Sequence, residues 1–332
     1  MIDFRYHVVS IVAVFLALAT GLVLGASLLN TPLIKGLDSA NETLIADKEE
    51  LRDQLTDAQA QRDALGASVL ALEPFALRDQ LAGQQVVMIQ LPGADDGITT
   101  GVSEAVAEAG GQVTGVVTVR DEWTAPGDQT VLDELVSRLA QPEVDFIPGD
   151  DSYGRAATLL ANALVAESDP TDPGTPAESG ATPPPTTVVD DEGRVTILEG
   201  LSRGGFIEAD TAIARADLAV VIAPPAPSEP DEQTPISNAA WADISAALDE
   251  IGRATVLIGS AEAAGENGVI AALRADETAA ANVSTVDSVD DPIGPAAAVL
   301  SLSRQLSGTN GHYGVVDAAD GPVPPFAASV EG

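Results

Sequence analysis

Few side chains in this 332-residue sequence have the types and spacing that catalysis requires. Ser260 and His312 are a nucleophile and a base of the kind that hydrolases use, but no G-x-S-x-G motif surrounds Ser260. The segment PGADDG, residues 92–97, lacks the G-x-G-x-x-G spacing and the lysine of a phosphate-binding loop, so we interpret Asp95 and Asp96 as solvated. A hydrolase built on Ser260 and His312 is therefore our last-ranked hypothesis, and no catalytic residue is predicted.

Metal-binding side chains are also scarce. Asp287, Asp290 and Asp291 supply hard oxygen ligands, but their spacing differs from that of a calcium-binding EF-hand loop. We interpret them as a capped loop before a helix that starts near Pro292. The sequence has no Cys, which excludes disulfides, thiolate metal sites and a Cys nucleophile. No resident metal and no cofactor are predicted.

The chain is strongly acidic, with 51 Asp and Glu residues against 15 Lys and Arg residues and a formal net charge of -36. Such a surface repels polynucleotides and anionic headgroups. We therefore expect no nucleic-acid partner and interpret the acidity as a solubilising surface.

An uncharged apolar segment, residues 8–29, lies near the start of the chain. About 20 apolar helical residues cross a hydrocarbon core roughly 30 Å thick, whereas a signal peptide has only ~7 to 15. We predict an uncleaved transmembrane anchor, with cleavage near Gly25 as the alternative. Arg5 and His7 precede the segment and acidic residues follow it, so we expect residues 1–7 in the cytoplasm and the bulk outside the cell (inner) membrane.

Small side chains recur every four residues in this anchor, at Ala13, Ala17, Gly21 and Gly25. They would lie on one helix face, where a second helix can approach closely. Small residues are common in transmembrane helices, but four in register favour a dimer. The segment has no polar face that could line a pore.

A heptad pattern follows the anchor and predicts a parallel coiled coil over residues 34–76. Its apolar positions alternate by three and four residues, and the polar Asn41 and Lys48 would fix a dimeric register. The alternative is one amphipathic helix packed on its own domain, which requires a broader apolar face. We expect Pro74 to end the run. The predicted core positions are Ile34, Leu37, Asn41, Leu44, Lys48, Leu51, Leu55, Ala58, Leu65, Val69 and Leu72.

Short apolar runs alternate with helical patterns from residue 83 onward, which is typical of parallel α/β units. We predict a three-layer, Rossmann-like α/β domain over residues 83–332 with a mainly parallel sheet. The predicted strands are 86–91, 113–119, 218–223, 255–259 and 283–289. The predicted helices are 98–109, 131–140, 154–166, 237–251, 269–275 and 295–306.

Two proline-rich segments interrupt this pattern. Residues 168–187 have too few apolar residues to bury and too many prolines for a helix or strand, which predicts a disordered loop. Residues 223–235, directly after a predicted strand, form a shorter loop of the same kind. We expect neither segment to carry chemistry.

Several motifs together resemble the actinobacterial copper-transporter family typified by MctB. They are MIDFRYHVVSIVAVFLALATGLVLGA at the start, the heptads, STVDSVDDPIGPAAAVLSL and the closing GHYGV. Towards the end of the chain, the residues that carry the likeness are Ser284, Thr285, Asp287, Pro292, Gly294, Tyr313 and Gly314. The family also looks like the SteB-type envelope proteins, which pair with a membrane partner called SteA in daughter-cell separation and are linked to control of septal peptidoglycan hydrolysis.

The resemblance implies copper efflux through the envelope, but the sequence offers few copper ligands. Copper(I) favours thiolate and thioether ligands and copper(II) favours imidazole, whereas the chain has no Cys, two Met and two His. Met88 is predicted to be buried in a strand. His7 and His312 would lie on opposite sides of the membrane.

Two hypotheses follow. The preferred one is a non-enzymatic, membrane-anchored protein, homodimeric through its anchor and coiled coil, that acts with a SteA-like membrane partner in cell separation. The alternative is copper transport across the envelope and copper resistance, with copper as the one ligand that the resemblance would add.

Overall fold

The computed structural model describes residues 4–146, 150–165, 189–210, 213–317 and 320–325, with the backbone alone for residues 4 and 26–40. The chain divides into two structural units, residues 1–65 and residues 66–332. The helix α1 (Phe4–Leu77) begins in the first unit and ends in the second. The predicted disordered loop, residues 168–187, lies outside the described residues.

Pro74 lies inside α1 rather than at its end, so the prediction that it ends the helix was wrong. Proline lacks one backbone donor but fits helical φ, and the helix continues to Leu77. The chain leaves the helix at Asp79, whose φ of 59° is left-handed. The backbone N–H of Leu81 then donates to the carbonyl of Ala109, which ties the end of the helix to the second unit.

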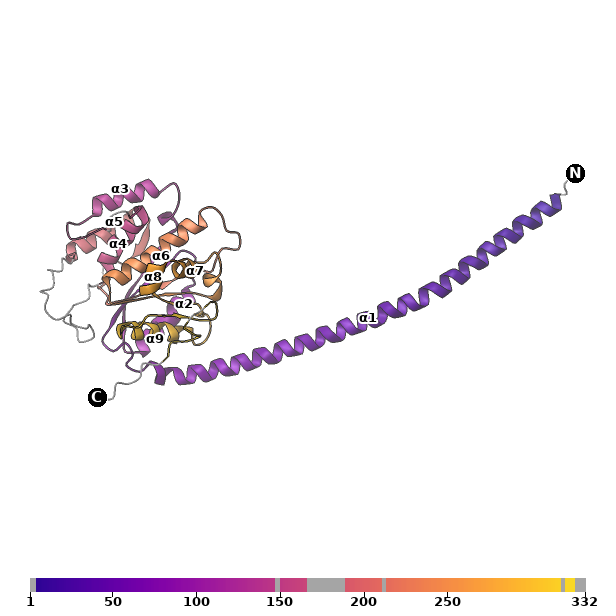
Figure 1. The fold of residues 1–332 in the computed structure, drawn as a ribbon, viewed down its shortest axis with the longest axis horizontal. Coiled ribbons are helices and arrows are strands. Elements are labelled where there is room, and N and C mark those ends of the chain that lie inside the picture. The colour runs from indigo at the N-terminus through magenta and orange to yellow at the C-terminus, as the bar shows by residue number, and fades with distance from the viewer. Residues whose placement is uncertain (1–3, 147–149, 166–188, 211–212, 318–319, 326–332) are drawn as a thin grey trace. The chain divides into compact units, whose positions relative to one another are not determined.

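The described residues of the second unit form a sheet of seven strands in the order β3-β2-β1-β4-β5-β6-β7. Figure 1 shows helices on either side of this sheet. Every neighbouring pair is parallel except β2 and β3, which are antiparallel. The prediction of an α/β fold with a mainly parallel sheet is confirmed. The strands are β1 (Gln85–Gln90), β2 (Gln112–Val119), β3 (Ile207–Ala209), β4 (Leu218–Ile222), β5 (Ala254–Ile258), β6 (Ser284–Val286) and β7 (His312–Tyr313).

Helices cover both faces of this sheet, so its central strands are buried on both sides. In β1, Val87 and Ile89 belong to the apolar cluster formed with α3, α4, α5, α6 and α7. Val86 and Met88 belong to the opposite cluster, formed with α2, α9 and the end of α1. The helices are α2 (Asp96–Glu108), α3 (Gln129–Leu139), α4 (Ser152–Leu164), α5 (Asp191–Arg203), α6 (Thr234–Ile251), α7 (Val269–Ala275), α8 (Glu277–Asn282) and α9 (Gly294–Leu306), with two short 3-10 turns, η1 (Asp121–Trp123) and η2 (Ala261–Ala264).

Several of the abundant aspartates cap helices. Asp95 accepts a hydrogen bond from the N–H of Gly97 at the start of α2, and Asp151 accepts from Tyr153 and Gly154 at the start of α4. The predicted capped loop before α9 differs from this pattern. The residue that precedes α9, Ile293, makes no side-chain cap hydrogen bond.

Candidate functional site

The order in which strands are added to the sheet reverses at β1. The carboxyl end of this strand is therefore the expected ligand site. The chain runs from β1 to β2 on one side and later returns to β4 on the other side of β1. In open α/β sheets, ligands bind in the crevice that such a reversal opens beyond the strand ends. A cavity of about 540 Å³ lies there, and we call it the switch-point pocket.

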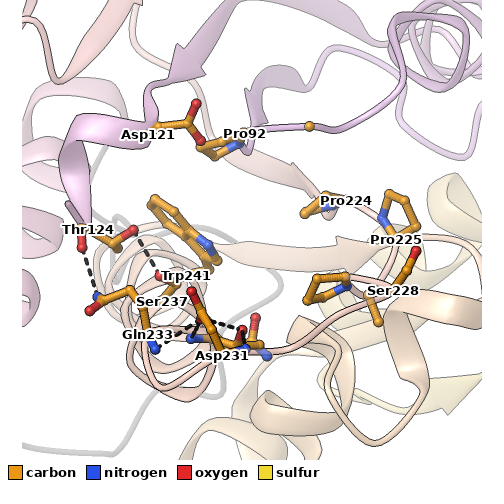
Figure 2. A pocket seen from close by; sticks show the side chains of 15 residues that line it. Pro92, Asp121, Thr124, Pro224, Pro225, Ser228, Asp231, Gln233, Ser237 and Trp241 are labelled. Carbon is orange, nitrogen blue, oxygen red and sulfur yellow. Dashed lines mark hydrogen bonds between the residues drawn. The ribbon is translucent and has the colours of Figure 1, made fainter. Parts of the chain in front are cut away.

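Residues that follow three neighbouring strands line the switch-point pocket. Pro92 and Gly93 follow β1, Asp121 and Thr124 follow β2, and the remaining lining residues lie between Pro224 and Trp241 after β4. Figure 2 shows these side chains arranged around the cavity. The proline-rich segment 223–235, which was expected to carry no chemistry, therefore supplies much of the pocket wall.

Hydrogen bonds hold the pocket wall in place. The side-chain amide of Gln233 donates to the carbonyl of Thr124 (2.8 Å), and the Ser237 hydroxyl donates to that of Thr124 (2.9 Å). Asp231 accepts from the backbone N–H groups of Gln233 and Thr234 and from the Thr234 hydroxyl (Figure 2). These bonds join the segment after β4 to the turn after β2.

The pocket carries negative charge. Hydrogen bonds from the Thr234 hydroxyl and backbone N–H lower the pKa of Asp231, so its carboxylate stays ionised at neutral pH. Asp121 adds a second carboxylate, and the described residues that line the cavity include no Lys, Arg or His. The lining therefore disfavours phosphate and other anionic ligands.

The motif residues near the end of the chain meet in a second cluster, around Asp287. Its side chain has no exposed surface and forms an ion pair with Arg274 of α7 (Nη1 to Oδ2, 2.9 Å). Its other carboxylate oxygen accepts from the backbone N–H groups of Val315 (2.6 Å) and Val316 (3.3 Å). Gly314 has a φ of +136°, and a Cβ at this position would overlap the Asp287 carboxylate.

Arg274 extends this cluster to β6 and β7. Its Nε donates to the Thr285 hydroxyl (2.9 Å), and its guanidinium also donates to the carbonyls of Tyr313 and Val316. Ser284 is buried, and its hydroxyl accepts from the N–H of Gly311 (3.3 Å). The arrangement is a buried, ion-paired network that closes the end of the sheet rather than an open reaction centre.

The structure does not bring Ser260 and His312 together. Ser260 follows β5 and His312 lies on β7, with β6 between them. The Nδ1 atom of His312 lies 3.0 Å from the Thr285 hydroxyl. Burial, together with the nearby Arg274 guanidinium, lowers the pKa of His312. The geometry thus gives no support to the hydrolase hypothesis.

The side chains considered as copper ligands belong to different parts of the chain. Met88 is fully buried within β1 and His7 lies in the first turns of α1. Among the described residues, no group of three or more His, Cys, Asp or Glu side chains could hold a metal ion. Together with the cationic neighbour of His312, this donor set of the described residues does not fit a resident copper ion.

The first unit contains one helical segment, Arg5–Gly25, that is long and apolar enough to cross a membrane by length and composition. Its small residues Ala13, Ala17 and Gly21 are exposed, as the predicted dimer face requires. An extra Cβ at Gly21 or Gly25 would meet nothing within 4 Å, so neither glycine is needed for packing within the single chain.

The Leu-rich heptad positions are uncovered in the single chain. Leu44, Leu51 and Leu65 are 67%, 64% and 69% exposed, and Leu72 is 65% exposed. Val69 is half-buried, since the last turns of α1 pack within the second unit. Asn41, Lys48, Leu55 and Ala58 are exposed as well, whereas the side chains of Ile34 and Leu37 lie outside the described residues.

Two partly buried aspartates on α6 were missed by the sequence analysis. Burial and the neighbouring Asp151 and Asp150 carboxylates raise the pKa of Asp243 to about 6. Burial raises the pKa of Asp249 to about 7, against hydrogen bonds from Thr255 and Gln305. Neither burial could be recognised from the sequence, because both residues occupy ordinary positions in an amphipathic helix.

Comparison with known proteins places the whole chain in one family. A family model described as "Copper transport outer membrane protein, MctB" matches residues 1–324. The chain belongs to the MctB family. The copper transporter MctB of Mycobacterium tuberculosis and that of Mycobacterium bovis are each 32% identical to it over 326 residues, covering 95% of this chain and 96% of the relative. The Mycobacterium leprae MctB is 31% identical over 331 residues, with the same coverage.

Membership of the MctB family confirms the resemblance drawn from the terminal motifs. It favours the copper hypothesis over the cell-separation hypothesis, because the relatives are named as copper transporters. With the apolar helix Arg5–Gly25, it also supports association with a membrane.

Proposed function

We propose that this chain takes part in copper transport across the cell envelope and in copper resistance, with copper as the cargo and without enzymatic activity of its own. The observation that carries this proposal is the similarity to copper transporters along nearly the whole chain. This similarity covers the predicted anchor, the predicted coiled coil of residues 34–76, which we call the stalk, and the α/β unit. Copper would be passed on rather than stored, since the described residues offer no cluster of metal ligands.

A pore formed by the single helix of one chain is difficult to reconcile with its residues. The segment from Val8 to Gly25 is uncharged and apolar, and a water-filled path needs polar side chains on one face. The chain therefore acts as an anchored component of a larger assembly. We place its amino terminus in the cytoplasm and the α/β unit outside the cell membrane, because Arg5 precedes the span and acidic residues follow it.

The first contact in this assembly is a second copy of the chain. The exposed Leu stripe of α1 has the spacing of a parallel coiled coil, and the small residues of the anchor continue the same association within the membrane. Each buried Leu of such a stalk contributes roughly 1.5–3 kcal/mol of apolar burial. A dimer formed through the stalk requires no metal site in either copy, so it agrees with the proposal that copper is cargo.

Cell copper tests the proposed function. A strain of the source organism without this gene is expected to accumulate copper and to become copper-sensitive, and the full-length gene is expected to restore both properties. His312→Ala and Met88→Leu variants should complement fully, because neither side chain serves as a resident ligand. Normal copper content in the deletion strain would contradict the proposal.

A second function, in cell separation, is favoured by the same exposed Leu stripe, which could bind a SteA-like membrane partner instead of a second copy. Deletion of residues 34–72 should then leave cells unseparated and alter septal hydrolysis, with unchanged copper content. Normal separation in this deletion would exclude the role. The two functions are thus distinguished by measuring copper content and cell chaining in the same strains.

A further inference from the structure

We propose that the switch-point pocket binds a neutral carbohydrate, either one sugar or a short glycan. The proposal concerns a site that copper transport does not use, and it stands independently of the proposed function. The cavity of about 540 Å³ falls within the roughly 300–1,000 Å³ that is usual for small-ligand sites. Its charge, its apolar walls and its polar groups each narrow the class of ligand.

The charges around the pocket disfavour anionic ligands. The carboxylates of Asp121 and Asp231 repel phosphates, nucleotides and carboxylates, and no basic side chain is among the described lining residues. The positive amino-terminal end of α6 faces the pocket through Thr234 and opposes the approach of a cation. Hydrogen bonds from Gln233 and Thr234 occupy Oδ1 of Asp231, which leaves Oδ2 as an acceptor for a ligand. A neutral ligand with several hydroxyl donors fits both conditions.

The walls are rigid and apolar. Pro92, Pro224, Pro225 and Pro227 line the cavity, and Trp241 contributes the small exposed part of an indole that is otherwise packed in the core. Figure 2 shows Trp241 among the labelled lining residues. Proline and indole surfaces suit the C–H faces of a sugar ring, and their fixed shapes lose little conformational entropy on binding.

Polar side chains of the lining supply the hydrogen bonds. Asn238 is 8% exposed, and its amide nitrogen donates to the carbonyl of Asn267 (2.8 Å). The amide nitrogen of Gln233 likewise donates to Thr124. Among the described residues, neither amide oxygen accepts a hydrogen bond, and each can accept one from a sugar hydroxyl. Acceptors that are free to bond favour a ligand with several donors.

The test uses one sugar ring in three charge states, with the full-length protein in polyoxyethylene detergent micelles, which contain neither sugar nor tryptophan. The probes are N-acetylglucosamine and its disaccharide (neutral), glucosamine (cationic) and N-acetylglucosamine 6-phosphate (anionic). The sequence has two tryptophans, so Trp123→Phe makes Trp241 the single reporter. We expect a saturable change of Trp241 fluorescence with the neutral sugars and at least tenfold weaker binding of both charged analogues.

Calorimetry with two matched variants locates the site. Ser228→Phe places a ring in the pocket from an exposed loop residue and should weaken binding of the disaccharide at least tenfold, whereas Ser307→Phe, an exposed serine outside the lining, should leave it unchanged. Circular dichroism checks that both variants are folded. The proposal is overturned if neither neutral sugar gives saturable binding, if a charged analogue binds more tightly, or if both Phe variants bind like the parent.

Discussion

Nη1 of Arg274 lies 2.9 Å from Oδ2 of Asp287, a side chain with no exposed surface. Removing one partner of a buried ion pair leaves the other charge uncompensated, which costs about 3–5 kcal/mol. Arg274→Met should therefore lower the free energy of unfolding by about that amount in urea denaturation followed by circular dichroism. Arg203→Met, which removes an exposed pair with Glu199, should cost less than roughly 1 kcal/mol. Equal losses in the two variants would contradict a structural role for the buried pair.

Gly314 tests the same cluster through the backbone. Its φ of +136° suits glycine, and a Cβ would overlap the Asp287 carboxylate. Gly314→Ala should lower the free energy of unfolding by more than about 2 kcal/mol, the combined cost of backbone strain and overpacking. Gly127→Ala is the matched control, because a Cβ there meets nothing within 4 Å. A melting temperature equal to that of the control would show that Asp287 and its partners move aside freely.

Asp249 predicts how stability depends on pH. Burial raises its pKa to about 7 in the folded chain, against about 3.9 when unfolded. The folded state therefore binds the proton more tightly than the unfolded state does. The resulting contribution to the free energy of unfolding is complete below about pH 4 and is lost as the pH rises through about 7. Asp249→Asn cannot ionise and should flatten this part of the stability curve by a few kcal/mol, in order of magnitude. Asp290→Asn, at an exposed position, should keep the slope of the parent. Parallel curves for Asp249→Asn and the parent would refute the assignment.

The stalk dimer can be tested by crosslinking, because the sequence has no Cys. Leu51 occupies a predicted core position and is 64% exposed in the single chain, so in a parallel dimer Leu51→Cys places two thiols across the seam. This variant should form a disulfide-linked dimer under mild oxidation in membranes. Asp53→Cys, on the outer face, should remain mostly monomeric. Equal crosslinking of the two variants would argue against a specific seam.

The sequence predicted the strands and helices whose patterns are local. The predicted strand 218–223 and helix 269–275 agree closely with β4 and α7. The short strands β3 and β7 were missed, because two or three residues cannot display a period. The predicted strand 283–289 ends early, at Val286, since Asp287 turns from the sheet to meet Arg274.

The two clusters were harder to foresee. Thr285, Asp287, Tyr313 and Gly314 were named from motif resemblance, but their shared partner Arg274 carries no local pattern that marks it. The pocket was missed because its wall looks like a featureless proline-rich loop in sequence. A site of this kind depends on the strand order, which brings the ends of β1, β2 and β4 together. The strand order cannot be predicted from the residues of any single segment.

The backbone contacts of Val315 and Val316 with Asp287 have a consequence for how the protein is made. Arg274 and Asp287 leave the ribosome before the two N–H groups that complete their network. The α/β unit therefore cannot reach its final structure until synthesis has passed Val316. A product that stops short of Val315 would leave the buried Asp287 carboxylate without these two donors.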